Sequence, residues 1–134
     1  MAGELAGKKA LLVDDDKDIL VAMEIALKDL GLEIWTAADG NDAIRQADEK
    51  APDLVVLDMM LPKRSGFLVM EKLKKGKKRT DPPRVIMITG NQGTRHRAYA
   101  ETLGVDVYLL KPFRMEKLVE SAKRLLGPQQ VDTA

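Results

Sequence analysis

Cysteine is absent from the 134 residues of this chain, which excludes a disulfide framework and a thiolate metal site. No apolar run approaches the roughly 20 residues that span a bilayer, and the N-terminus lacks the basic and apolar layout of a signal peptide. An excess of one charge sign is also lacking, because the net charge is only +1, which argues against wholesale nucleic-acid binding. We therefore expect a cytoplasmic protein with no membrane partner and no direct nucleic-acid partner.

Short apolar runs alternate with helical patterns along the chain, and 45% hydrophobic residues are enough for the core of one domain. The predicted strands cover residues 10–13, 32–37, 54–57, 84–89 and 105–110. Helices are predicted over residues 19–30, around 43–47, and over 66–75, 94–103 and 115–126. This alternation favours an α/β fold, in which helices cover both faces of a parallel sheet.

Polar side chains stand where four of these strands end. Asp14 and Asp15 follow the first strand, Asp58 follows the third, Thr89 ends the fourth, and Lys111 follows the fifth. Parallel strands bring these ends to one edge of the sheet, where ligands of open α/β sheets gather. Three neighbouring carboxylates repel one another, and Mg²⁺ with its preference for oxygen ligands relieves this repulsion. The set predicts phosphoryl chemistry, with Asp58 as the nucleophile and Thr89 and Lys111 contacting the phosphoryl oxygens.

Several of these features also have ordinary structural interpretations. For Asp58 taken alone, a helix cap or a strand end is the commoner role, and Asp16 is expected to cap the first helix rather than bind metal. His96, the single histidine, is expected to have neither a metal nor a relay role. The basic run over residues 72–79 is expected to be a solvated helix end, because the net charge is near zero. Tyr108 is either a half-buried strand residue or part of a switch.

Four segments, each at a predicted strand end, resemble the receiver domain of bacterial two-component response regulators. They are Val13-Asp14-Asp15, Asp58-Met-Met-Leu-Pro62 with Gly66, Thr89-Gly90, and Tyr108-Leu-Leu-Lys111-Pro112-Phe113. The resemblance implies a doubly wound, five-stranded parallel sheet of the (βα)5 flavodoxin-like type with strand order 2-1-3-4-5. It spans residues 8–126, so we expect a flexible N-terminal extension over 1–7 and a C-terminal tail over 127–134.

The same resemblance implies a phosphoacceptor. Asp58 would receive a phosphoryl group from a phosphohistidine on a sensor histidine kinase or a histidine phosphotransfer protein. The implied ligands of Mg²⁺ are Asp14, Asp15, Asp58 and the backbone carbonyl of Met60. Apart from its own phosphorylation and slow dephosphorylation, the protein is not expected to be an enzyme.

The resemblance further implies a switch. Phosphate would draw Thr89 inward, and Tyr108 would follow from exposed to buried. The surface of the fourth helix, fifth strand and fifth helix would then change its affinity for a downstream protein target. Lys111–Pro112 is expected to be a cis peptide, and Met60 with Asn91 suggests an intermediate phosphate lifetime. The chain is expected to be a monomer or a weak, phosphorylation-linked dimer.

Two alternatives remain open at this point. A small Mg²⁺-dependent phosphatase of haloacid-dehalogenase type also uses a strand-end aspartate, but it needs a second aspartate two residues later, where this chain has Met60. A receiver-like interaction module that takes no phosphate is the other alternative. No effector domain is recognisable after Leu126, so we expect either a stand-alone receiver or a receiver excised from a longer regulator.

Overall fold

The sheet carries the expected strands in the expected order. The computed structural model describes residues 3–61, 65–90 and 94–127. Five parallel strands lie in the order β2-β1-β3-β4-β5, which confirms the predicted fold class. Their bounds are β1 Lys9–Val13, β2 Glu33–Ala37, β3 Leu54–Asp58, β4 Arg84–Thr89 and β5 Val107–Leu110.

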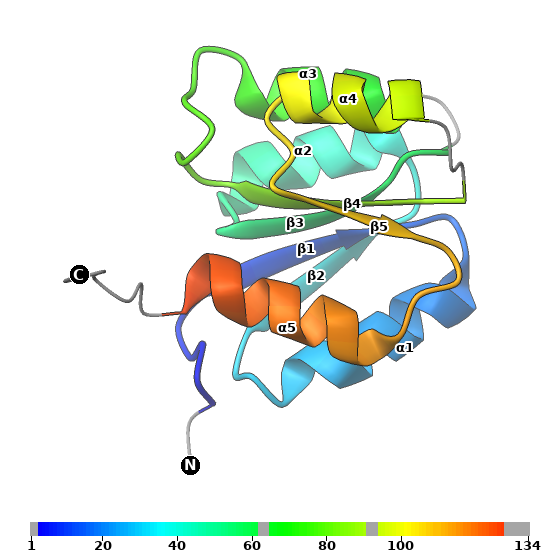
Figure 1. Cartoon of the computed structure of the whole chain (residues 1–134). Helices are drawn as coiled ribbons and strands as arrows, with labels where there is room; N and C mark the ends of the chain where they lie inside the picture. The colour runs from blue at the N-terminus through cyan, green and yellow to red at the C-terminus, as the bar shows by residue number, and fades with distance from the viewer. Residues whose placement is uncertain (1–2, 62–64, 91–93, 128–134) are drawn as a thin grey trace, which may run out of the picture.

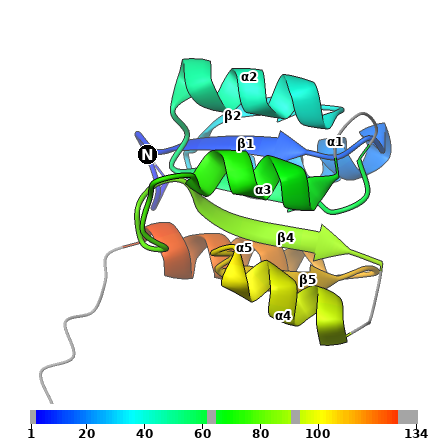
Figure 2. The same cartoon turned by 90° about the horizontal axis from the view of Figure 1, so that it is seen from above.

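Helices cover both faces of this sheet. Their bounds are α1 Lys17–Lys28, α2 Gly40–Lys50, α3 Gly66–Lys74, α4 Thr94–Thr102 and α5 Met115–Leu126. Helices α1 and α5 lie on one face, and α2, α3 and α4 lie on the other (Figure 1). Seen from above, α3 lies between α2 and α4 (Figure 2). None of the helices in the described part of the chain has the length and apolarity to cross a membrane.

Two apolar clusters separate the layers, because successive strand residues point to opposite faces. Leu12 and Val56 belong to the cluster under α1 and α5, whereas Leu11 and Val55 belong to the cluster under α2, α3 and α4. All five residues of β3 are buried, as expected for a central strand covered on both faces. Each buried leucine or valine contributes about 1.5–3 kcal/mol to folding, so β3 holds the sheet, and Asp58 at its end, firmly in place.

The segment before β1 packs against the domain. Leu5 is buried among the residues under α1 and α5, and its backbone N–H donates to the carbonyl of Leu30 at 2.7 Å. Gly3 lies so close to Leu30 that an added Cβ would meet its carbonyl carbon at 2.2 Å. Gly3 and Leu5 therefore pack against the domain within the segment that we expected to be a flexible extension, whereas residues 1–2 and residues 128–134 of the expected C-terminal tail lie outside the described part.

The basic run over residues 72–79 differs from its expected role at one position. Lys74 is buried, and its ammonium donates to the carbonyls of Arg79 at 2.9 Å, Asp81 at 2.6 Å and Lys78 at 3.5 Å. Burial lowers the pKa of Lys74. The connection from α3 to β4 folds back over the helix end with its carbonyls turned toward this side chain. Lys74 therefore holds that connection in place, whereas the other basic residues of the run are exposed to solvent as predicted.

The start of the last strand differs from the predicted one for an identifiable reason. Strand β5 begins at Val107 rather than at Val105, because the Val105 N–H donates to the Ala100 carbonyl at the end of α4. Asp106 then uses its carboxylate to accept the Val85 N–H at 2.8 Å.

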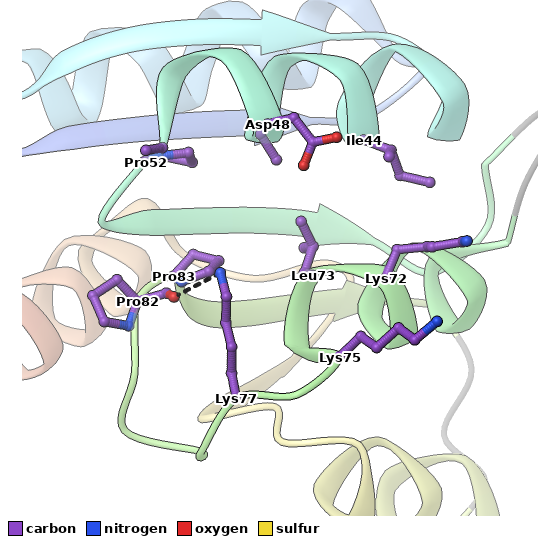
Figure 3. A pocket seen from close by; sticks show the side chains of 11 residues that line it. Ile44, Asp48, Pro52, Lys72, Leu73, Lys75, Lys77, Pro82 and Pro83 are labelled. Atoms are coloured by element: carbon purple, nitrogen blue, oxygen red, sulfur yellow. Dashed lines mark hydrogen bonds between the residues drawn. The ribbon is translucent and has the colours of Figure 1, made fainter.

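A hollow lies at the edge of the sheet where β3 and β4 begin. It opens between the C-terminal ends of α2 and α3 (Figure 3).

Candidate functional site

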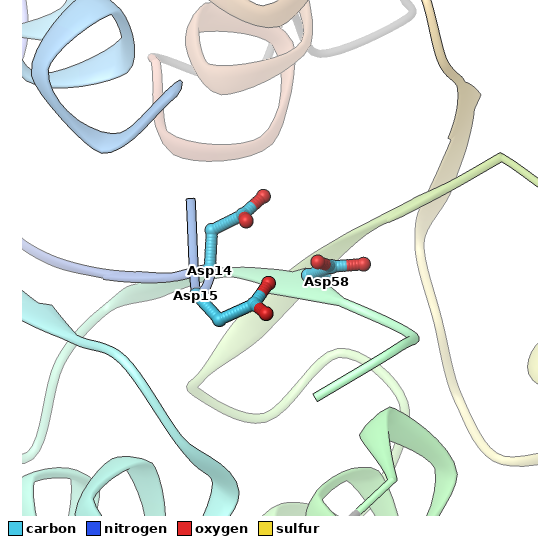
Figure 4. A group of neighbouring side chains, drawn as sticks. All are labelled: Asp14, Asp15 and Asp58. Atoms are coloured by element: carbon cyan, nitrogen blue, oxygen red, sulfur yellow. The ribbon is translucent and has the colours of Figure 1, made fainter. Parts of the chain in front are cut away.

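Three carboxylates meet at the carboxyl edge of the sheet. Val13 of β1 pairs with Leu57 of β3, so the next residues along each strand, Asp14 and Asp58, lie side by side. Asp15 follows, and carboxylate oxygens of all three lie within 4.8 Å of one another (Figure 4). Asp14 and Asp58 are buried, whereas Asp15 is exposed. The structure thus brings the predicted acidic residues together and leaves one side of the cluster open to solvent.

Lys111 provides a positive charge at this cluster. Its Nζ lies 3.3 Å from Asp14 Oδ2 and 3.4 Å from Asp58 Oδ2. The backbone of Lys111 is held by its N–H, which donates to the Thr89 carbonyl at 2.7 Å. The peptide bond from Lys111 to Pro112 is cis, as expected.

Backbone amides orient the two buried carboxylates. Asp14 Oδ1 accepts the Asp16 N–H at 2.9 Å, and Asp58 Oδ1 accepts the Met60 N–H at 3.1 Å. Each of these carboxylates therefore turns Oδ1 toward the backbone and Oδ2 toward Lys111. Asp16 in turn caps α1 by accepting the N–H groups of Asp18 and Ile19, which confirms its predicted role.

Burial perturbs the acid–base properties of the site. The pKa of Asp58 is raised to about 6 from an ordinary 3.8, mainly by burial and to a smaller extent by the Asp14 carboxylate, while the Met60 N–H and Lys111 act against the increase. Burial acts to lower the pKa of Lys111, but Asp58 and Asp14 outweigh it, so that pKa is raised. At neutral pH the lysine is charged and Asp58 is mostly ionised. One cation then faces three carboxylates, and this donor set fits a divalent cation with oxygen ligands.

Thr89 and Tyr108 connect the site to the last strand. Thr89 is fully buried at the end of β4, and its side chain hydrogen-bonds to that of Tyr108. Tyr108 is half-buried, with the Arg97 guanidinium 5.8 Å from its ring centroid. Burial raises the pKa of the Tyr108 phenol, while Thr89 and Arg97 act in the opposite direction. The predicted phosphate contact and the predicted switch residue are therefore direct neighbours.

Gly66 is a site-supporting residue whose role the sequence pattern did not reveal. A Cβ at this position would lie 2.6 Å from the Met59 Cα and 2.7 Å from the Asp58 carbonyl oxygen. Its N–H donates to the Met59 carbonyl at 2.8 Å. The glycine thus lets the start of α3 approach the backbone beside Asp58. Its position four residues after Pro62 in the sequence was the available signal.

Some predicted features cannot be placed. Pro62 and Asn91 lie outside the described residues, and so does the side chain of His96. Met60 is exposed, and its N–H donates to Asp58 Oδ1. Its carbonyl as a metal ligand stays a prediction.

Comparisons with known proteins agree with this geometry. A family model for the response regulator receiver domain matches residues 10–123. The BeF3-activated receiver domain of DrrB, a Thermotoga maritima OmpR/PhoB homologue, is 36% identical over 89% of this chain and 97% of that chain, with a TM-score of 0.78. The chemotaxis protein CheY4 of Vibrio cholerae is 28% identical over 90% of this chain and 100% of its own, with a TM-score of 0.79.

A third solved structure is similar to the same extent. The signal receiver domain of a Luxo repressor protein from Vibrio parahaemolyticus is 26% identical over 89% of both chains, with a TM-score of 0.82. These structures share the five-stranded fold, and the family match covers the four strand ends that form the acidic cluster and its lysine. This chain therefore belongs to the response regulator receiver domain family of two-component systems.

Proposed function

We propose that Asp58 is the phosphoacceptor of a signalling switch. The observation that carries this proposal is a buried carboxylate at the end of β3, with the Lys111 ammonium 3.4 Å away and two further carboxylates within 4.8 Å. The pKa of Asp58, about 6, leaves the side chain mostly ionised at pH 7 and therefore nucleophilic. Members of this family receive phosphoryl groups from histidine kinases or phosphotransfer proteins, so the donor is a phosphohistidine.

The proposed reaction is a single phosphoryl transfer. One carboxylate oxygen of Asp58 attacks the phosphorus, and the bond from phosphorus to the donor imidazole nitrogen breaks, with its electron pair remaining on nitrogen. An acyl phosphate forms on Asp58. Lys111, placed between Asp14 and Asp58, stabilises the negative charge on the phosphoryl oxygens. The Thr89 hydroxyl donates to one of these oxygens.

The acidic cluster supports a place for Mg²⁺. Asp14, Asp15, Asp58 and the Met60 carbonyl would hold it, with Asp15 on the open side of the cluster. When bound, Mg²⁺ neutralises charge on the phosphoryl oxygens. The chain itself supplies the orientation of the ligands, because the backbone amides of Asp16 and Met60 hold the buried carboxylates of Asp14 and Asp58 in fixed orientations.

The contact between Thr89 and Tyr108 supports the proposed output. A phosphoryl group that engages the Thr89 hydroxyl competes with its bond to Tyr108. A change in the position of the Tyr108 side chain then alters the surface of α4, β5 and α5. Arg97 of α4 lies over the Tyr108 ring at this surface. We propose that a downstream protein reads this change.

The geometry bears on the alternative phosphatase function, whereas the alternative of an interaction module is a question for experiment. Met60 stands where a haloacid-dehalogenase phosphatase needs its acid, and its side chain is exposed, so the geometry does not favour that chemistry. An interaction module that takes no phosphate is distinguished by experiment.

The decisive experiment is intact mass spectrometry after incubation with Mg²⁺ and acetyl phosphate. We expect one added phosphoryl group on the wild type, lost on hydroxylamine treatment, and none on Asp58→Asn. Asp48→Asn, which changes an exposed carboxylate on α2, is the matched control and should be labelled like the wild type. An adduct that persists on Asp58→Asn would place the acceptor elsewhere, and no adduct on the wild type would favour the interaction module.

A further inference from the structure

A second feature lies at the edge of the sheet opposite Asp58. A hollow of about 430 Å³ opens between the C-terminal ends of α2 and α3, and the connection that leads into β4 closes it. Pro52 and Pro83, which precede β3 and β4, are buried at its floor together with Leu73. Ile44 of α2 contributes further apolar surface (Figure 3). Its volume falls within the range of about 300–1,000 Å³ that is typical of binding sites.

The hollow is bordered by positive charge. Lys72, Lys75 and Lys77 line it, whereas Asp48 is the single carboxylate among the lining residues. All three lysines are exposed, and Lys77 donates to the Pro82 carbonyl at 3.3 Å, which holds its ammonium at the rim. Within the described part of the chain, these lysines form no ion pair with a carboxylate.

The helix dipole accounts for only part of this pattern. A cation in the last turn of a helix is stabilised by the carbonyls there, which explains Lys72 in the last turn of α3. It does not explain Lys75 and Lys77, which lie beyond the helix, or the recessed apolar floor beside them. An apolar recess with uncompensated cations on one wall is complementary to an apolar side chain flanked by carboxylates.

We propose that this hollow, the α2–α3 groove, binds an acidic peptide segment of a partner protein. An apolar side chain of the segment enters the groove, and its carboxylates pair with Lys72, Lys75 and Lys77. A nucleic acid fits less well, since no aromatic ring lines the groove for base stacking and Asp48 would repel a phosphate backbone. A lipid surface also fits less well, because none of the large exposed apolar side chains in the described part of the chain lines it.

Binding at the groove is independent of the phosphoacceptor. Pro52 lies at the groove and Asp58 lies six residues further along β3, which at about 3.3 Å per residue separates them by roughly 20 Å. A phosphodonor and the acidic segment can therefore bind the same molecule at once. The groove would hold the receiver near its partner in both phosphorylation states.

The test is a titration of the ¹⁵N-labelled full chain, followed by amide chemical shifts, with a peptide of one leucine flanked by three glutamates on each side. We expect shifts that centre on Ile44, Leu73 and Lys77 and leave the amides around Asp58 in place. The triple variant Lys72→Glu, Lys75→Glu, Lys77→Glu should bind about tenfold more weakly, as the loss of three exposed ion pairs predicts.

A matched triple variant separates the groove from overall charge. Lys8→Glu, Lys28→Glu, Lys117→Glu makes the same charge change at exposed positions elsewhere and should bind the peptide nearly as well as the wild type. Asp48→Asn should tighten binding. Equal losses in both triple variants, or no shifts with the wild type, would overturn the proposal.

Two further probes test the class of partner. A peptide with glycine in place of leucine should bind more weakly, and equal binding would remove the apolar floor from the proposal. Oligothymidylate or phosphatidylglycerol vesicles that shift the same amides more strongly would reassign the surface to nucleic acid or to lipid. Both triple variants should still accept phosphate from acetyl phosphate, so a failure here is distinguishable from a failure of the phosphoacceptor proposal.

Discussion

At the scale of single residues, burial sets the chemistry of Asp58. The residue is 4% exposed at the end of a fully buried strand, and burial is the largest cause of its raised pKa. Lys111 and the Met60 N–H limit the increase, which keeps the carboxylate mostly ionised at pH 7. A buried aspartate without these two partners would be neutral more often and a poorer nucleophile.

This raised pKa predicts a stability effect with a defined sign. Between about pH 4 and pH 6, folded Asp58 holds a proton that the unfolded chain has released, so the free energy of unfolding falls as pH rises through this range. Asp58→Asn, which cannot ionise, should be more stable than the wild type by about 1–3 kcal/mol at pH 7, with the difference vanishing near pH 4.

Urea unfolding without divalent cations, at pH 7 and at pH 4, measures this difference. Asp48→Asn, which changes an exposed carboxylate, should show no such pH dependence. An Asp58→Asn variant that is less stable than the wild type at pH 7 would contradict the explanation.

Gly66 gives a second prediction at the residue scale. Because an added Cβ would lie 2.6 Å from the Met59 Cα, Gly66→Ala must displace backbone and should lower the free energy of unfolding by about 1–3 kcal/mol. Gly90→Ala is the matched control, since a Cβ there meets nothing within 4 Å. Thermal unfolding of both variants checks this, and equal melting temperatures would show that the start of α3 yields freely.

At the scale of elements, the ends of the helices decide the loop geometry. Asp16 caps α1 and Asp39 caps α2 through hydrogen bonds to the first N–H groups, as short polar side chains commonly do. The connection from α3 to β4 is held differently, by the buried Lys74 ammonium. One side chain there collects three carbonyls and fixes the path that leads into β4.

Lys74→Met should therefore destabilise the protein although it removes a buried charge. The Arg79 and Asp81 carbonyls lose a charged donor, and we expect a loss of about 1–3 kcal/mol in the free energy of unfolding. Lys75→Met, at the exposed neighbouring position, should change stability by less than about 0.5 kcal/mol. Urea denaturation of the two variants makes the comparison, and equal stabilities would mean that water replaces the ammonium without cost.

At the scale of the whole molecule, the two proposals assign separate tasks to the two edges of the sheet. The carboxyl edge gathers charge from β1, β3 and β5, because parallel strands end together there. The opposite edge carries the α2–α3 groove. Under both proposals, we expect phosphorylation at the carboxyl edge to leave the groove unchanged.

Metal binding at the carboxyl edge should stabilise the whole fold. A ligand that binds only the folded chain adds about 1.4 kcal/mol at ten times its Kd, so Mg²⁺ should raise the melting temperature of the wild type. Asp15→Asn removes a carboxylate from the cluster and should reduce both this increase and the affinity measured by calorimetry. Asp18→Asn, at an exposed position in the first turn of α1, is the control. An undiminished response of Asp15→Asn would remove this residue from the metal site.

The alternation of strands and helices and the polar residues at the strand ends were predictable from the amino-acid sequence. These depend on apolar periodicity and on turn-forming residues, which act over a few neighbouring positions. Asp14, Asp15, Asp58, Thr89 and Lys111 were assigned to one edge for this reason alone, because parallel strands end together.

The way in which those residues meet depends on contacts in the folded chain. The pairing of Val13 with Leu57 places the carboxylates of Asp14 and Asp58 side by side. Lys111, which lies 53 positions after Asp58 in the sequence, contacts both of them. The burial of Lys74 and the close approach at Gly66 were not visible in the sequence, nor was the α2–α3 groove. Each depends on contacts between segments that local patterns do not specify, because packing and burial are properties of the whole fold.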